Sequence, residues 1–200
     1  MKKTITRISN KCVVVVLVGF AMTGFAQDPL ELDQTMKTKL LDILAAVNES
    51  SAESAAKLDA AIDFQAITRG VMGKHAKGST QAQNSRFQAE FQKSMIRLLQ
   101  AATETAGDYT IEVSGTKISP KNPERGQASA RVRTSDGQEI DLVSSIAVVD
   151  GEWKVRNLIF AGVNLGKTYR NQFDQLVQAN QGDLDQAIEA WAQQVKNPAE

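Results

Sequence analysis

Hydrophobic positions in the first half of the chain recur every three or four residues, which is the spacing of one face of a helix. Short polar stretches divide this pattern into segments. The first segment begins at Asp28-Pro29, where aspartate can cap a helix and proline is tolerated at its first position. The longest begins with a capping box, in which Thr80 caps and Gln83 reaches back. We therefore expect helices over residues 28–44, 52–61, 63–73 and 80–102.

The period changes to two in the second half, where Tyr109, Ile111 and Val113 alternate with polar residues. Asp150-Gly151 is the strongest hairpin signal in the chain. The segment 122–126 is rich in polar residues and is expected to be a loop. Four strands are predicted, one starting at residue 109 and the others over 128–134, 138–149 and 152–160. The connections between them are too short for a crossover helix, so the strands should form an antiparallel meander.

Helical spacing resumes after Gly162 and is interrupted at Gln181-Gly182. Two further helices are expected, one through residues 169–177 and one over 183–195. The predicted fold class is therefore α+β. It has a helical N-terminal half, a four-stranded antiparallel meander sheet and two C-terminal helices, with the helices on one face of the sheet.

The first 26 residues have the three parts of a secretory signal peptide. Four basic residues precede the apolar run 13–22, and small residues follow at Gly24 and Ala26. We expect cleavage after Ala26 and a single domain over residues 27–200, outside the cytoplasm. The alternative is an uncleaved anchor, but the run is shorter than the roughly 20 apolar residues of a membrane-spanning helix.

Removal of this segment changes the charge of the protein. The whole chain has 23 basic and 23 acidic residues, and the segment contains four basic and no acidic ones, which leaves 19 against 23. A mildly acidic protein lacks the basic surface typical of nucleic-acid binding, so no nucleic-acid partner is expected. The single cysteine, Cys12, also lies in this segment, so the remaining domain has no thiol, no disulfide and no expected lipid anchor.

Candidate catalytic residues are few. An enzyme site needs a nucleophile with a base, paired carboxylates or a metal cluster. The one histidine, His75, lies in a polar stretch and is expected to be exposed. Of the acidic pairs, Glu139 and Asp141 fit a solvated strand face, and Asp183 with Asp185 fits a helix cap. We therefore expect no catalytic residue, no metal and no cofactor.

Apolar side chains instead form two extended sets. Such sets either fill a core or line a cavity between helices and a curved sheet, and periodicity alone leaves both open. The helical set consists of Phe64, Ile67, Val71, Met72, Phe87, Phe91, Met95, Leu98 and Leu99. The strand set consists of Ile140, Leu142, Ile146 and Val148 on one strand, and of Trp153, Val155 and Ile159 on one face of the next.

Four blocks, in order, resemble the MlaC-type family of periplasmic phospholipid-binding proteins, also called toluene-tolerance auxiliary proteins of ABC transporters. The resemblance covers nearly all of residues 27–200. The chain departs from the family pattern at Ala76, Asn157, Ala161 and Asn164. The blocks are 63–73, 80–91, then 151–155 with 162–164 and 169–173, and finally 182–188.

The resemblance implies a soluble periplasmic phospholipid carrier, the substrate-binding component of an ABC-type lipid transport system that maintains outer-membrane lipid asymmetry. Its partners would be a phospholipid ligand, an inner-membrane ABC lipid transporter and an outer-membrane lipoprotein complex, the latter two through transient docking. The acyl chains would lie between sheet and helices, with Trp153 in the core. The expected lipid-binding residues are Phe64, Ile67, Val71, Phe87, Phe91, Met95, Leu99, Ile146, Val148, Val155, Phe160 and Tyr169.

Two other functions remain compatible with the sequence. The first is a non-catalytic protein-interaction module of the cell envelope with a filled core and no ligand. The second is an enzyme with an extracytoplasmic substrate, which would have to use His75. A collapsed interface between helices and sheet, without a ligand, would favour the first, and a complete loss of function in His75→Ala would favour the second.

Overall fold

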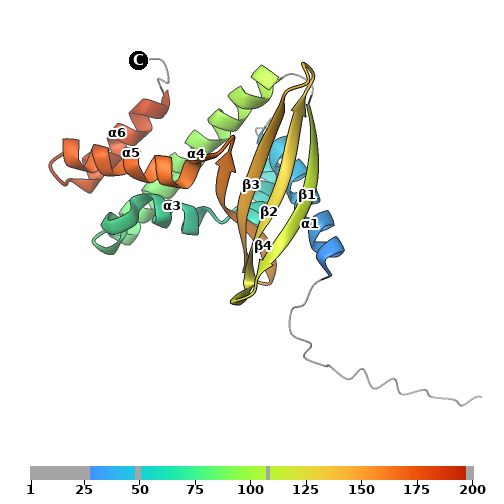
Figure 1. Cartoon of the computed structure of the whole chain (residues 1–200). Coiled ribbons are helices and arrows are strands. Elements are labelled where there is room, and N and C mark those ends of the chain that lie inside the picture. Colours follow the sequence, from blue (N-terminus) through green and yellow to red (C-terminus); the bar gives the residue numbers. More distant parts are fainter. Residues whose placement is uncertain (1–27, 48–50, 107–108, 197–200) are drawn as a thin grey trace, which may run out of the picture.

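The computed structural model describes residues 28–47, 51–106 and 109–196, so the predicted signal segment and Cys12 lie outside the described residues. Helices and strands follow the predicted order (Figure 1). The elements are α1 (Pro29–Val47), α2 (Ala52–Ala61), α3 (Phe64–Met72), the 3-10 helix η1 (Gly73–Lys77), α4 (Gln81–Ala106), β1 (Tyr109–Ser119), β2 (Asn122–Thr134), β3 (Glu139–Val149), β4 (Glu152–Phe160), β5 (Val163–Asn164), α5 (Leu165–Ala179) and α6 (Leu184–Lys196).

The sheet is an antiparallel meander in which each strand pairs with the next, in the order β1-β2-β3-β4-β5. The predicted α+β class and meander are confirmed. The described residues contain five strands rather than four, because Val163 and Asn164 pair with Phe160 and Ile159 at the end of β4. A strand of two residues is too short to show an alternating pattern.

The predicted loop over 122–126 is wrong, because β2 already begins at Asn122. Gly126 pairs with both Ile118 and Ile146 within the sheet. A Cβ atom at this position would lie 2.8 Å from the carbonyl oxygen of Lys117. The glycine therefore permits a close approach of two strands and does not mark a turn.

Strand β4 contains a bulge at Arg156, which lies between the partners of Ser145 and Ile146. Beyond the bulge the alternation of side chains is inverted. The prediction that Val155 and Ile159 share one face of the strand is therefore wrong. The even-numbered residues after the bulge take the place of Ile159 on the face that carries Val155.

Asp63, at the start of α3, contacts both residues of β4 at this bulge. Asp63 is 8% exposed and caps the helix, since its Oδ1 accepts the N–H of Ala66 at 3.0 Å. Its Oδ2 accepts a hydrogen bond from Nε of Arg156 at 2.7 Å and forms an ion pair with Nη2 of the same guanidinium, also at 2.7 Å. The Asp63 N–H also donates to the Val155 carbonyl oxygen at 2.9 Å. One buried carboxylate thus connects the helical layer to the sheet through charge-assisted hydrogen bonds.

The helices contact the sheet mainly near the two ends of its strand order. Helix α1 contacts β1, whereas α2, α3 and α5 contact β4. In Figure 1, α1 lies behind the strands, and α3, α5 and α6 lie together beyond β4. On α1, the side chains at successive helical turns that are buried in the core are Leu32, Met36, Leu40 and Ile43.

An aromatic cluster joins α4, α5 and α6. Phe87 and Phe173 have ring centroids 4.4 Å apart, and Phe91 stacks on Trp191 at 5.9 Å. The Trp191 Nε1–H donates to the Ser94 hydroxyl at 3.1 Å, so the indole is also satisfied as a donor. The rings of the cluster belong to Phe87, Phe91, Tyr169, Phe173 and Trp191.

The predicted capping box at the start of α4 is confirmed. The Thr80 hydroxyl accepts the N–H of Gln83 at 3.2 Å, and the Gln83 side-chain oxygen accepts the N–H of Thr80 at 2.9 Å. This reciprocal pair satisfies two donors at the helix start. It fixes the position at which α4 begins.

His75 is not the exposed residue that its polar sequence context predicts. Its side chain is 19% exposed, and Nε2 lies 2.6 Å from Oδ1 of Asp174. The imidazole meets Phe173 edge to face, with centroids 6.3 Å apart. The Lys74 ammonium, 2.9 Å from the same carboxylate, and His75 together lower the pKa of Asp174 to about 2.

Replacement of Phe87 by alanine should destabilise the protein by about 3–5 kcal/mol, the usual cost of removing a fully buried ring. Phe87 is 0% exposed and contacts three other rings. Urea unfolding followed by tryptophan fluorescence measures the effect. Phe160→Ala is the matched control, because Phe160 is 38% exposed and should cost less than half as much. Equal losses for the two variants would contradict the packing described for the cluster.

Asp174 should make stability depend on pH in the acid range. Its pKa in the folded protein lies below the ordinary 3.8, so its ionised form stabilises the fold above that value. The wild type should exceed Asp174→Asn in free energy of unfolding at about pH 5, and the difference should shrink as the pH falls toward 2. A difference that stays constant between these two pH values would rule out the ion pairs as its source.

Candidate functional site

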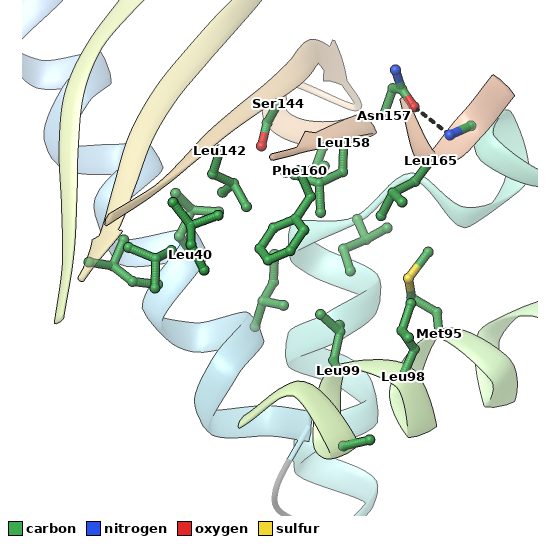
Figure 2. Close-up of a pocket in the computed structure, with 18 of the residues that line it drawn as sticks. Leu40, Met95, Leu98, Leu99, Leu142, Ser144, Asn157, Leu158, Phe160 and Leu165 are labelled. Carbon is green, nitrogen blue, oxygen red and sulfur yellow. Dashed lines mark hydrogen bonds between the residues drawn. The ribbon is translucent and has the colours of Figure 1, made fainter. Parts of the chain in front are cut away.

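A cavity of about 880 Å³ lies between the sheet, α1 and the second half of α4 (Figure 2). Its volume is in the upper part of the range of small-molecule sites, roughly 300–1,000 Å³. The helices, together with Ile62 between α2 and α3, contribute Leu40, Ile43, Ile62, Ile67, Phe91, Met95, Leu98, Leu99, Ala101, Leu165, Gly166 and Tyr169. The strands and the β2–β3 turn contribute Ile111, Val132, Thr134, Ser135, Asp136, Gln138, Ile140, Leu142, Ser144, Val155, Asn157, Leu158 and Phe160.

The walls are apolar because two periodicities meet there. Strand alternation directs Ile140 and Leu142 of β3 to the same side of the sheet. On α4, Phe91, Met95 and Leu99 recur every four residues and form a stripe that faces them. Figure 2 shows aliphatic side chains from strands and helices pointing toward one another across the space.

Asn157 supports the wall where the sheet meets α5. Its side-chain oxygen accepts the N–H of Gly166 at 3.1 Å, and its Nδ2 donates to the side-chain oxygen of Asn164 at 3.2 Å. Asn164 in turn caps α5 by accepting the N–H of Lys167 at 3.0 Å. A Cβ atom on Gly166 would collide with the Asn157 amide. Two positions that depart from the family pattern thus have a structural role at the start of α5.

Polar groups of the cavity gather at the β2–β3 turn, where Thr134, Ser135, Asp136 and Gln138 contribute to the lining. Asp136 is the only charged side chain among the lining residues that the structure describes. Hydrogen bonds from the Thr134 hydroxyl and then from the Gln138 backbone N–H lower the pKa of Asp136. The carboxylate is therefore ionised at neutral pH, and the rest of the lining is uncharged.

The rim of the cavity has exposed apolar side chains. Leu98 is 44% exposed and Phe160 is 38% exposed, and both also belong to the lining. Val163 of β5, directly opposite Phe160 in the sheet register, is 51% exposed. The hydrophobic surface of the cavity thus continues to the outside of the molecule.

The structure brings seven of the twelve expected lipid-binding residues to this cavity. They are Ile67, Phe91, Met95, Leu99, Val155, Phe160 and Tyr169. Burial raises the pKa of the Tyr169 hydroxyl, so this group is neutral at physiological pH. That these seven side chains contact a ligand stays a prediction.

The other five expected residues lie outside the cavity lining. Phe87 belongs to the aromatic cluster, and Ile146 and Val148 lie farther along β3 than the cavity extends. Helical and strand periodicity cannot separate a cavity wall from a packed core, because both require apolar residues at the same spacing. The five residues are Phe64, Val71, Phe87, Ile146 and Val148.

Several lining residues were missed by sequence reasoning. Leu158 faces the cavity only because of the bulge at Arg156, for which the sequence carries no clear signal. Leu40 and Ile43 lie on a recognised helical stripe, but the sequence does not show which part of the sheet that helix covers. Ser144 is polar, so a pattern of apolar positions does not identify it as part of the wall.

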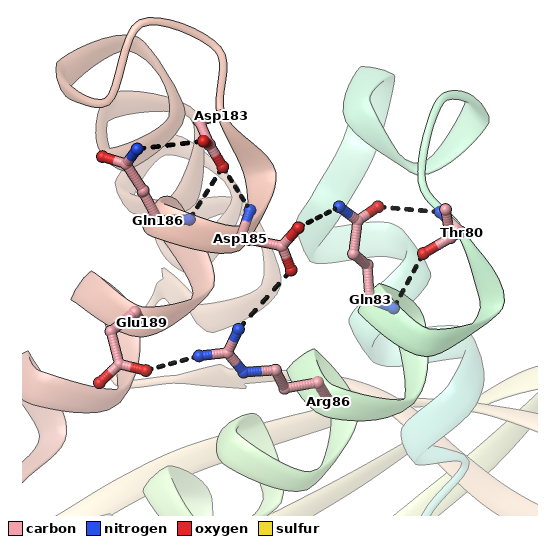
Figure 3. A network of polar contacts seen from close by, with 7 residues as sticks. All are labelled: Thr80, Gln83, Arg86, Asp183, Asp185, Gln186 and Glu189. Carbon is pink, nitrogen blue, oxygen red and sulfur yellow. Dashed lines mark hydrogen bonds and ion pairs between the residues drawn. The ribbon is translucent and has the colours of Figure 1, made fainter.

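The acidic residues at the start of α6 stabilise helices (Figure 3). Asp183 accepts the N–H groups of Asp185 at 2.9 Å and Gln186 at 3.0 Å, and the Gln186 bond lowers the pKa of Asp183. Asp185 accepts from the Gln83 amide at 2.9 Å and lies 3.6 Å from Arg86 of α4. The expected helix-capping role of Asp183 is confirmed.

Groups that could carry catalysis do not meet in this cavity. His75 does not belong to the lining, and Glu139 and Asp141 pair with Arg133 and Arg131 on an exposed strand face. Among residues 28–47, 51–106 and 109–196, no three His, Cys, Asp or Glu side chains are grouped as metal ligands would be. Within the same residues, no helix has both the length and the hydrophobicity needed to cross a bilayer.

Comparisons with known proteins agree on one family. Residues 31–193 match the family model described as MlaC protein. The chain is 30% identical over 198 residues to the toluene tolerance protein ttg2D of Pseudomonas putida, covering 94% of this chain and 91% of the relative. A solved phospholipid-binding protein from Ralstonia solanacearum, in complex with a phospholipid, has the same fold, with a TM-score of 0.70 and 19% identity over 84% of this chain and 98% of that one.

The cavity should bind apolar probes, and a charge on its wall should prevent this. In Leu142→Arg protein refolded from denaturant, 1-N-phenylnaphthylamine should bind at least about tenfold more weakly than in wild type, because an unpaired guanidinium in an apolar site is costly. Fluorescence titration measures the affinity. Val143→Arg is the matched control, since Val143 is adjacent on β3 but faces the opposite side of the sheet. Equal binding by the two variants would place the probe elsewhere.

Proposed function

The chain belongs to the MlaC family, and we propose that it is a periplasmic phospholipid carrier, the substrate-binding component of an ABC-type lipid transport system. In this role it accepts a phospholipid at one membrane, shields the acyl chains from water and releases the lipid at the other. The proposal extends to an inner-membrane ABC lipid transporter and an outer-membrane lipoprotein complex as docking partners. It also includes export by cleavage after Ala26, as the sequence predicts.

The cavity is the observation that supports this function most. Each methylene moved from water into an apolar site contributes about 0.8 kcal/mol, so acyl chains need a deep apolar enclosure to cross an aqueous space. A space of about 880 Å³, lined mainly by Leu, Ile, Val, Met, Phe and Tyr side chains, provides one. A filled core, as the alternative of a ligand-free interaction module requires, would have no such space.

The relatives support the same ligand class. The solved protein of the same fold is described as phospholipid-binding and contains a phospholipid. In the present chain, the acyl chains would lie among Leu99, Leu142 and Leu158. The head group would lie toward the rim, where Phe160 and Leu98 are partly exposed and water can solvate it.

Binding and release require no bond to be made or broken, so the proposed carrier is not an enzyme. The polar groups at the β2–β3 turn can hydrogen-bond a ligand without chemistry. His75, the candidate base of the enzyme alternative, is engaged with Asp174 and lies outside the cavity lining. Because the one histidine of the chain is paired with Asp174, the hypothesis that the protein is an enzyme is disfavoured.

The mature protein, residues 27–200, should co-purify with phospholipid at a stoichiometric level. Organic extraction followed by mass spectrometry identifies the lipid, and a fluorescent phospholipid should move between donor and acceptor vesicles faster when the protein is present. Leu142→Arg should abolish both signals, whereas Val143→Arg should retain them. Absence of lipid in native protein and in protein refolded with phospholipid vesicles would refute the proposed function.

A further inference from the structure

Ser144 is a polar residue in an otherwise apolar part of the cavity wall. It lies in the middle of β3 and is 1% exposed, yet it belongs to the cavity lining. Its hydroxyl oxygen has no hydrogen-bond partner among the described residues. Figure 2 shows this side chain directed from the strand toward the cavity, near Leu142 and Leu158.

The neighbours of Ser144 in the sheet cannot satisfy the hydroxyl. Its partners across the two adjacent strands are Ala128 and Leu158, and Leu142 and Ile146 flank it on the same face of β3. None of these side chains has a donor or an acceptor. A buried hydroxyl without a partner is unfavourable, and buried polar groups in folded proteins nearly always have one. The cavity that Ser144 lines is therefore the source we consider for its missing partner.

The charge of the cavity limits the chemistry of that partner. A phosphate next to Ser144 would be a buried anion beside a neutral donor, and Asp136, the one charged residue among the lining residues that the structure describes, is itself negative. The cost of removing such an anion from water would not be offset by a nearby positive charge. Hydrocarbon chains, in contrast, offer no acceptor. A neutral carbonyl oxygen within an apolar ligand meets both conditions.

We propose that the Ser144 hydroxyl donates a hydrogen bond to the ester carbonyl of an acyl chain held in the cavity, and so selects ester-linked over ether-linked lipids. This inference rests on the proposed function, since it assigns one contact within the lipid site. It places the junction between glycerol and acyl chain at the level of β3. The acyl tails then extend along the apolar side chains of α4.

The test compares two lipids that differ only at this junction. A diacyl phosphatidylglycerol and the dialkyl ether analogue with the same chain length and head group are bound to delipidated, refolded protein, and the Kd of each is measured by displacement of 1-N-phenylnaphthylamine. The wild type should bind the ester roughly 3- to 10-fold more tightly than the ether, as one net hydrogen bond predicts. Ser144→Ala should bind the two lipids equally, because the donor has been removed.

Ser145→Ala is the matched control, because Ser145 is adjacent in sequence and faces the opposite side of the sheet. It should keep the preference of the wild type for the ester. An unchanged preference in Ser144→Ala, or no preference in the wild type, would overturn the inference while leaving lipid binding intact. Failure of the wild type to bind either lipid would instead refute the proposed function itself.

Discussion

The packing of the first half of α4 determines the arrangement of the rest of the molecule. The helix is 26 residues long, or about 39 Å at 1.5 Å per residue. Its first turns are held by the capping box at Thr80 and by the rings around Phe87, so its direction is fixed before it reaches the sheet. The second half must then pass over the strands at a set distance. Met95 and Leu99 face an open space for this reason, although Phe87, on the same stripe, is fully buried.

This division of one helix separates stability from binding along the sequence. The ring of Phe87 contributes to stability through contacts within the protein, whereas Leu99 has part of its surface available to a ligand. Phe91 and Tyr169 belong to both regions, since they join the aromatic cluster and also line the cavity. The cluster is therefore the rigid end wall of the site, and the wall opposite is the sheet.

Local sequence patterns predicted most of the fold, but only seven of the 25 residues that line the cavity were expected to bind lipid. Helical spacing, the capping box at Thr80 and the Asp150-Gly151 hairpin depend on residues near one another in sequence, and the structure agrees with each. The errors involve distant partners. The bulge at Arg156 reflects its pairing with Asp63, and the burial of His75 reflects a carboxylate 99 residues away. The cavity itself depends on the distance between two layers, which periodicity does not encode.

The pairing of Asp63 with Arg156 has a consequence for how the protein unfolds. The same carboxylate caps α3 and binds the strand bulge, so α3 cannot detach without breaking the cap, the ion pair and the backbone bond to Val155 together. Helical layer and sheet are thereby coupled into one cooperative unit, even though a cavity separates much of their surfaces. Any separation of the two layers must therefore either break these three interactions together or occur away from Asp63 and Arg156.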